Sequence, residues 1–314
     1  MIKYALNIEP EKFEPGLDYT DGIVFSGSCF SDHIALRMTE CRFHVFSQPN
    51  GVVFNPISIA DAFQRLNGRD YSKDDLVHYN GLWHSKYHHG SFSEIDEAAV
   101  LKKANHKLHE LKRHMEGASF LFITFGSAYV YEHTQTGELY ANCHKIPQKA
   151  FRKRRLSVEE IVLCWSDLIS SLKGAYPQLR IVFTVSPVKH LRDGVIENTI
   201  SKSTLFMAIH QLMKPETSLL YFPAWELVND DLRDYRFYEQ DGAHPNAMAI
   251  AYVYEKFKAA VYNKATIVYT EEVEQFNQMC RHRFRREDGE AYLQFMRSLE
   301  SKRNELNLKY GLEL

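Results

Sequence analysis

Short apolar runs separated by polar, helix-like segments are the main pattern of this sequence. Four of the runs are rich in β-branched and aromatic residues: IVFS at 23–26, FLFITF at 120–125, IVFTV at 181–185 and LLYF at 219–222. Such runs are typical of strands that are buried on both faces of a parallel sheet. We expect a further strand within FHVFSQPNGVVF at 43–54.

Helical segments are expected between these runs. In SVEEIVLCWSDLISSLKGAYP, Ser157 and Glu160 have the spacing of a capping box, and Gly174 with Pro177 marks the end of the helix. Another helix is expected at about 246–264. Strands that alternate with helices of this length favour a mostly parallel sheet with helices on both faces.

Two regions depart from the alternation. Residues 57–116 lack a strong strand signal and look helical at both ends, around the aromatic and histidine-rich stretch HYNGLWHSKYHHGSFSE. We expect this region to be an insertion over one end of the sheet. From residue 268 the chain is polar and helical, which predicts a C-terminal helical hairpin at 268–314. The whole chain, 1–314, is expected to form a single domain.

Composition and charge narrow the functional classes. The chain has 314 residues, and 38 Lys and Arg nearly balance 40 Asp and Glu, so its charge does not favour nucleic acid or an anionic membrane. No secretion signal and no run of 18 apolar residues is visible, so we expect a cytoplasmic protein. The five cysteines form no CxxC pair, which argues against a disulfide framework and a structural zinc site. The oligomeric state is not predicted.

The segment DGAHPN at 241–246 contains the first candidate for chemistry. Asp241 and His244 are three residues apart on the turn that leads into the helix expected at 246–264, so the carboxylate can lie beside the imidazole. Pro245 suits the first helical position. A carboxylate that holds an imidazole is the orienting half of a catalytic triad. The alternative is a helix start in which the aspartate caps and the histidine has no role.

The turn after the first apolar run, SGSCFS at 26–31, contains the second group of candidate catalytic residues. Open α/β sheets place reactive groups at the carboxyl ends of their strands, and Ser28 comes first in this turn. A helix N-cap is its alternative role. We expect Cys29 to pack in the core and Ser31 to cap the following helix. A serine needs a base, which the Asp241–His244 pair would supply.

Seven motifs in order resemble the GSCFA domain family: GSCFS, FNP at 54–56, TFGSAYVY at 124–131, NCHKIP at 142–147, TVSPVKHLRDG at 184–194, LRDYRFY at 232–238 and DGAHPN. The resemblance extends from about residue 20 to 260. That family looks like a branch of the SGNH (GDSL-like) hydrolases, which implies a three-layer, flavodoxin-like α/β/α fold. It also implies a triad of Ser28, His244 and Asp241.

An oxyanion hole is expected beside this triad, because acyl transfer needs donors aimed at the developing negative charge. The Ser28 amide fits the superfamily pattern. Gly51 is the glycine best placed after the second strand, with Asn55 as a nearby competitor. No asparagine follows the third strand. We therefore expect Asn142 to return to the site through a hairpin around HTQTGEL, with Gly126 or Ser127 as alternative donors.

A histidine-rich group completes the candidates. Imidazole and thiolate suit zinc, so His84, His88 and His89 with Cys143 and His144 form an alternative metal site, but they lack the HExxH spacing. We favour a substrate pocket and expect neither metal nor cofactor. The residues expected to contact substrate are Asn55, His84, His88, His89, His144, Lys189 and His190.

The sequence thus predicts a serine hydrolase that cleaves an ester-linked acyl group from a carbohydrate or another small polar molecule. We expect no nucleic-acid or membrane partner. An O-acyltransferase with the same triad and a non-catalytic binding module on the same scaffold remain alternatives. A metallohydrolase is a fourth interpretation.

Overall fold

A five-stranded parallel sheet forms the centre of the protein. The computed structural model describes residues 6–214, 217–283 and 289–314. The sheet order is β10-β9-β5-β1-β2, and every neighbouring pair is parallel. Numbered along the chain, this is the order 2-1-3-4-5 of flavodoxin-like folds, so the predicted fold class is confirmed. The strands are β1 (Gly22–Gly27), β2 (His44–Ser47), β5 (Ala118–Phe125), β9 (Arg180–Val185) and β10 (Leu220–Tyr221).

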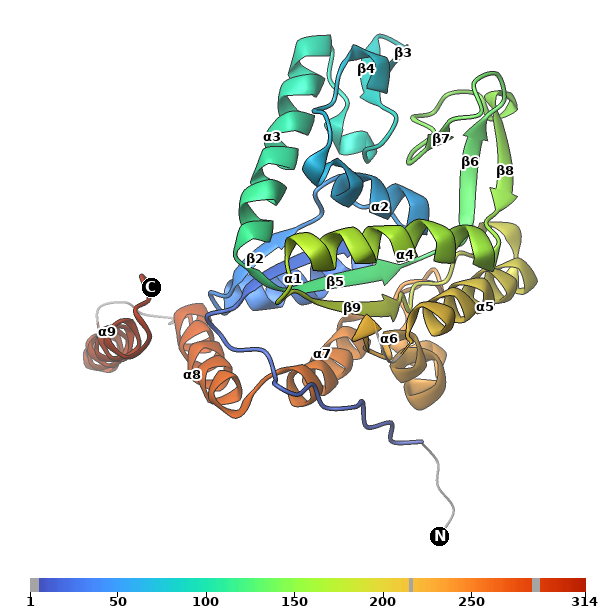
Figure 1. Cartoon of the computed structure of the whole chain (residues 1–314). Helices are drawn as coiled ribbons and strands as arrows, with labels where there is room; N and C mark the ends of the chain where they lie inside the picture. The colour runs from blue at the N-terminus through green and yellow to red at the C-terminus, as the bar shows by residue number, and fades with distance from the viewer. Residues whose placement is uncertain (1–5, 215–216, 284–288) are drawn as a thin grey trace.

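Helices cover both faces of the sheet because successive residues of each strand face opposite sides. In β5, Leu121 and Ile123 belong to one apolar cluster, while Phe120 and Phe122 belong to the other. The first face packs against α2 (Pro56–Gln64), α3 (Glu97–Glu116), α4 (Val158–Ala175) and α5 (Val195–Leu212) (Figure 1). The second packs against α1 (Cys29–Glu40), α6 (Ala224–Glu226), α7 (Ala247–Val261) and α8 (Lys264–Arg281).

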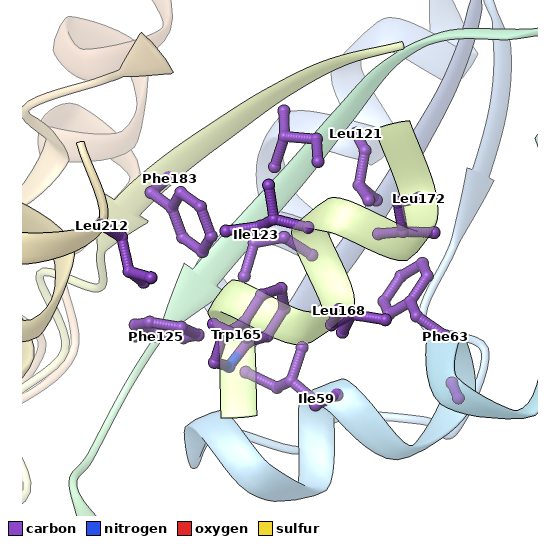
Figure 2. Packing of buried hydrophobic residues seen from close by; sticks show 14 of the residues in the cluster. Ile59, Phe63, Leu121, Ile123, Phe125, Trp165, Leu168, Leu172, Phe183 and Leu212 are labelled. Atoms are coloured by element: carbon purple, nitrogen blue, oxygen red, sulfur yellow. The ribbon is translucent and has the colours of Figure 1, made fainter. Parts of the chain in front are cut away.

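Trp165 is the largest fully buried side chain of the first face (Figure 2). Its ring lies edge-on to Phe125 and Phe183, each with centroids 5.2 Å away. Its indole Nε1 donates to the Pro56 carbonyl (3.1 Å), so a polar bond also joins α4 to the start of α2. The capping box of Ser157 and Glu160 that begins α4 is present as predicted.

Two antiparallel units lie outside the parallel sheet, one beside α3 and above α2 and the other beyond the end of β5 (Figure 1). One is the hairpin of β3 (Leu76–Tyr79) and β4 (Leu82–Ser85). The other is a small sheet of β6 (Tyr129–His133), β7 (Leu139–Tyr140) and β8 (Phe151–Arg155), which includes the hairpin predicted around HTQTGEL. Residues 57–116 are helical at both ends as expected, and between these helices they also contain the β3–β4 hairpin, which was not predicted. Asn80 and Gly81 both have positive φ there, which matches the two-residue turn that Asn-Gly favours.

The remaining short elements are single turns in the connections: η1 (Arg65–Asn67), η2 (Lys73–Asp75), η3 (Gly90–Phe92), η4 (Gln148–Ala150), η5 (Leu191–Asp193), η7 (Leu227–Leu232) and η8 (Tyr235–Phe237). At the C-terminus, α8 and α9 (Glu290–Tyr310) form the predicted helical hairpin, joined through Phe276, Leu299 and Leu306. Among the helices that the structure describes, none has the length and apolarity to cross a membrane.

Candidate active site

Ser28 occupies the sharp turn between β1 and α1. The preceding Gly27 has φ +136°, and a Cβ there would lie 2.2 Å from the Thr124 carbonyl oxygen of β5, so only glycine fits. Ser28 is 3% exposed, and its Oγ accepts a long hydrogen bond from the Phe30 amide (3.3 Å). Ser28, not Ser31, is therefore the N-cap of α1. The cap prediction was wrong because the helix begins at Cys29, which places Ser31 inside its first turn with Oγ donating to the Ser28 carbonyl (2.7 Å).

Cys29 packs against the apolar cluster of the second face, as expected. Burial, and next the negative charge of Asp32, raise the pKa of its thiol. A thiol with a raised pKa holds little of the reactive thiolate at neutral pH. The environment of Cys29 thus disfavours it as a nucleophile.

Asp241 and His244 form a close pair on the turn before α7. Asp241 Oδ2 lies 2.6 Å from His244 Nδ1, while Oδ1 accepts the amides of Ala243 (2.8 Å) and His244 (3.0 Å). The bonds from the two amides and from the imidazole lower the pKa of Asp241 to about 2. The carboxylate is therefore ionised at neutral pH. Asn246 is the N-cap of α7, so Pro245 precedes the helix and does not occupy its first position.

The Asp241–His244 turn is attached to the loop that follows β9. The Lys189 amide donates to the Ala243 carbonyl (3.0 Å). Burial is the main cause of a lowered pKa at His33 of α1 and at His190, and the charge of His244 lowers both further. Through the Lys189–Ala243 bond, the Asp241–His244 turn lies against the loop that follows β9, at the carboxyl edge of the sheet to which Ser28 also belongs. His244 is half exposed. In the described structure Ser28 Oγ accepts the Phe30 amide and forms no hydrogen bond with His244.

The backbone amides expected to form an oxyanion hole are already engaged. The Ser28 amide donates to the Thr124 carbonyl (3.2 Å), and the Gly51 amide donates to the Gln48 carbonyl (2.9 Å). The amides of Gly126 and Ser127 both donate to the Phe54 carbonyl (2.8 and 3.0 Å). Asn142 Oδ1 accepts the His144 amide (2.8 Å), and Asn142 Nδ2 has no partner among the described residues. Asn142 is thus the proposed donor with hydrogen-bonding capacity to spare.

The expected substrate-contact residues are dispersed. His84 and His144 stack with ring centroids 4.6 Å apart and line a pocket of about 300 Å³. His88 is fully buried between Tyr71 and Phe92, with Nδ1 bonded to the Ser85 hydroxyl, so its ring lines no surface that a substrate could contact in this structure. Burial lowers the pKa of His88 to about 3 and that of His144 to about 4. Within the described ranges, no three His, Cys, Asp or Glu side chains are grouped to hold a metal ion.

The other members of that set have equally specific surroundings. Asn55 is the buried N-cap of α2 and bonds Ser58 through both side-chain atoms, so its structural role explains its position. His89 Nδ1 accepts the Ser91 amide (3.2 Å). Lys189 Nζ lies 3.8 Å from the centre of the Tyr238 ring. His190 packs against Phe54 with centroids 5.1 Å apart, and its buried Nε2 has no hydrogen-bond partner among the residues that the structure describes.

Sequence reasoning missed two residues that shape this edge. Gln48, directly after β2, bonds the turn that contains Ser28 through both side-chain atoms. Lys202 of α5 is buried and donates to the carbonyls of Gly126 (2.6 Å) and Ser186 (2.8 Å), at the ends of β5 and β9. No sequence signal marks Gln48. Asn198, Ser201 and Lys202 do occupy one helical face at spacings of three and four, which is the pattern of a buried face with polar members.

The topology of the sheet defines the class of protein. A parallel sheet in the order 2-1-3-4-5 between two helical layers is a flavodoxin-like α/β/α architecture. Within that class the chain belongs to the GSCFA family, whose model matches residues 22–257. A comparison with curated proteins finds no match.

Several solved structures are loosely similar. A protein from Parabacteroides merdae whose description compares it with GDSL lipases is 14% identical, with 79% of this chain and 99% of that chain covered and a TM-score of 0.35. A carbohydrate esterase family 3 protein from Talaromyces cellulolyticus is 8% identical (81% and 99% covered, TM-score 0.37). An acetyl xylan esterase from Butyrivibrio proteoclasticus is 8% identical (77% and 65% covered, TM-score 0.38). Such low TM-scores carry no conclusion about reaction or substrate.

Proposed function

We propose that the protein is a serine hydrolase that cleaves an ester-linked acyl group, with a carbohydrate or another small polar molecule as the alcohol. The observation that carries the proposal is the 2.6 Å bond between Asp241 and His244 on a turn attached to the same sheet edge as Ser28. A buried serine at the carboxyl end of a central strand is where an α/β sheet places a nucleophile. The resemblance of the GSCFA family to SGNH hydrolases supports the same assignment.

In this mechanism the Ser28 side chain turns from its weak bond with the Phe30 amide toward His244 Nε2. His244 takes the Ser28 proton as Oγ bonds the ester carbonyl carbon, and Asp241 stabilises the imidazolium. Collapse of the tetrahedral intermediate breaks the carbon–oxygen bond to the alcohol, which leaves with the proton from His244. Water then attacks the acyl-enzyme by the same route and restores Ser28. Asn142 Nδ2 is the proposed oxyanion donor.

The test compares hydrolysis of p-nitrophenyl acetate by the wild type, Ser28→Ala and His244→Gln. Each variant is expected to lose activity by about a thousandfold or more, because members of a triad act together. Ser170→Ala is the matched control, since Ser170 is an exposed serine of α4 that bonds only its own helix, and it should keep full activity. Circular dichroism shows whether the variants fold. Equal rates in folded Ser28→Ala and wild type would overturn the proposal.

A fluorophosphonate probe gives a second readout that needs no matching substrate. The probe should label the wild type at Ser28 and should leave Ser28→Ala unlabelled. An unlabelled but folded wild type would indicate a binding module in place of an enzyme. Release of p-nitrophenol that depends on an added sugar alcohol would indicate acyl transfer in place of hydrolysis.

A further inference from the structure

A pocket of about 350 Å³ adjoins the proposed catalytic edge. One of its lining residues is Asn142, the proposed oxyanion donor, and the other lining residues have no role in the mechanism above. It lies between the β6–β8 sheet and the segment 141–148, and Phe54, Tyr131, Ile146 and Phe151 form its apolar walls. The Phe54 carbonyl holds the amides of Gly126 and Ser127, directly after β5. The pocket therefore begins beside the strand whose Thr124 carbonyl accepts the Ser28 amide.

The charge of this pocket is one-sided. Lys145 and Arg192 line it, and no acidic residue within the described ranges does. Neighbouring carboxylates are paired with other cations: Asp193 with Lys153, Glu132 with Arg152 and Arg154, and Glu138 with Lys86. Neither Lys145 nor Arg192 forms a hydrogen bond or an ion pair with any residue that the structure describes. Two cations beside an apolar cavity provide an attractive site for an anion.

The position of Arg192 relative to the pocket wall has independent support. Burial raises the pKa of the Cys143 thiol to about 11, and the charge of Arg192 acts in the opposite direction. Cys143 is itself a lining residue, so the guanidinium charge acts on the pocket's own wall. Arg192 belongs to η5, in the loop after β9 that also contains Lys189 and His190.

Lys145 is held over the pocket by a strained turn. His144 and Lys145 have φ of +49° and +60°, and the Ile146 amide donates to the Cys143 carbonyl (2.8 Å), as in a two-residue turn that normally uses Asn and Gly. The turn is kept in place because His144 Nε2 bonds the Ser85 carbonyl of β4 (2.8 Å). Strained turns of this kind concentrate at ligand sites, where neighbouring contacts maintain them.

We propose that this pocket binds the part of the substrate that carries a carboxylate on a ring-sized apolar group, with Arg192 and Lys145 on the carboxylate and Phe54, Tyr131 and Phe151 around the ring. The identification of this ligand as part of the substrate rests on the proposed hydrolase function. The pocket itself is independent of it. Aromatic walls with a few placed polar groups are the usual composition of small-ligand sites.

The first experiment measures binding without turnover. Phenylacetate is titrated into the full chain and compared with phenylacetamide, which has the same shape and no charge. We expect phenylacetate to bind more tightly and to weaken by about two- to fivefold in Arg192→Gln and in Lys145→Gln, the effect of an exposed charge pair. Lys149→Gln is the matched control, because Lys149 is an exposed lysine of the same connection outside the pocket, and it should leave binding unchanged.

The second experiment links the pocket to the reaction. Hydrolysis of mono-p-nitrophenyl succinate, which carries a carboxylate, is compared with hydrolysis of p-nitrophenyl acetate, which does not. The kcat/KM for the succinate ester divided by that for the acetate ester should fall in Arg192→Gln and Lys145→Gln but not in Lys149→Gln. Charge-selective binding of phenylacetate without hydrolysis of either ester would overturn the hydrolase and leave the pocket standing. Equal binding of phenylacetate and phenylacetamide, or binding that ignores both substitutions, would overturn the pocket.

Discussion

Gln48 is hydrogen-bonded to Ser28 across the end of the sheet. Gln48 Nε2 donates to the Ser28 carbonyl (3.3 Å) and to Ser31 Oγ (3.2 Å), while Gln48 Oε1 accepts the Gly27 amide (3.1 Å). The main chain of Gln48 has φ +53°, and its amide donates to the Phe25 carbonyl (2.9 Å). Gln48, a single residue directly after β2, therefore fixes the turn from which the proposed nucleophile projects.

Substitution of Gln48 should slow the reaction more than it weakens substrate binding. Gln48→Leu removes three hydrogen bonds from the turn, and misplacement of a nucleophile by about 1 Å costs about a hundredfold in rate. We therefore expect kcat to fall about ten- to hundredfold with KM nearly unchanged. The free energy of unfolding should fall by about 1–3 kcal/mol, because buried groups of the turn lose their partners.

Gln48→Glu and His44→Gln separate the possible causes. The glutamate still accepts the Gly27 amide but cannot donate to Ser28, so its kcat should lie between those of Gln48→Leu and wild type. His44 is exposed at the start of β2, the strand that precedes Gln48, and His44→Gln should leave kcat and stability unchanged. Steady-state kinetics and urea unfolding provide these values. Full activity in Gln48→Leu would contradict the positioning role.

Gly126 should tolerate no side chain. An added Cβ would lie 2.7 Å from Phe54 Cβ and 3.3 Å from His190 Nε2, and Phe54 Cβ is close to the main chain and cannot swing away. We expect Gly126→Ala to lower the free energy of unfolding by about 1–3 kcal/mol through overpacking. Because the Gly126 amide and carbonyl bond Phe54 and Lys202, the same change should also reduce esterase activity.

Gly174 provides the opposite case. It lies near the end of α4 with nothing within 4 Å of an added Cβ, so Gly174→Ala should stabilise the protein by about 0.5–1 kcal/mol through helix propensity alone. Thermal unfolding of the two variants distinguishes the effects. Equal stability of Gly126→Ala and wild type would show that the Phe54 loop can move, and the tight approach at this edge would then be wrong.

The features that sequence reasoning predicted are those that short segments determine. The apolar runs form β1, β5, β9 and β10 because a strand buried on both faces needs a continuous run. The contact between Asp241 and His244 follows from a spacing of three residues on one turn. Parallel strands then bring their carboxyl ends to one edge, which is why Ser28 and a turn more than two hundred residues later belong to the same region.

The features that were missed depend on packing between distant segments. His84 and His88 are both in WHSKYHH, yet one lines a pocket and the other is enclosed by Tyr71 and Phe92. The sequence offers the amides of Gly51 and Gly126 as oxyanion donors, but in the structure they donate to the carbonyls of Gln48 and Phe54. The β3–β4 hairpin did carry a local signal, Asn80-Gly81, which the surrounding histidines and aromatics obscured.

The burial of Lys202 makes the stability of the protein depend on pH. Lys202 Nζ bonds two main-chain carbonyls and lies 5.0 Å from the centre of the Trp225 ring, and no carboxylate of the described part of the chain is bonded to it. Burial lowers the pKa of Lys202 from 10.5 to about 7. Between these two values the unfolded chain holds a proton that the folded protein has released. The free energy of unfolding therefore rises with pH across this window.

A Lys202→Met variant lacks this titration, so the difference in unfolding free energy between wild type and variant should grow in favour of the wild type from pH 7 to pH 9. A proton bound only in the unfolded state contributes up to about 1.4 kcal/mol per pH unit, which predicts a gain of about 2–3 kcal/mol over this range. Urea unfolding at pH 7, 8 and 9 measures it. Lys149→Met, at an exposed lysine, should give a constant difference. A constant difference for Lys202→Met as well would show that Lys202 keeps its proton in the folded protein.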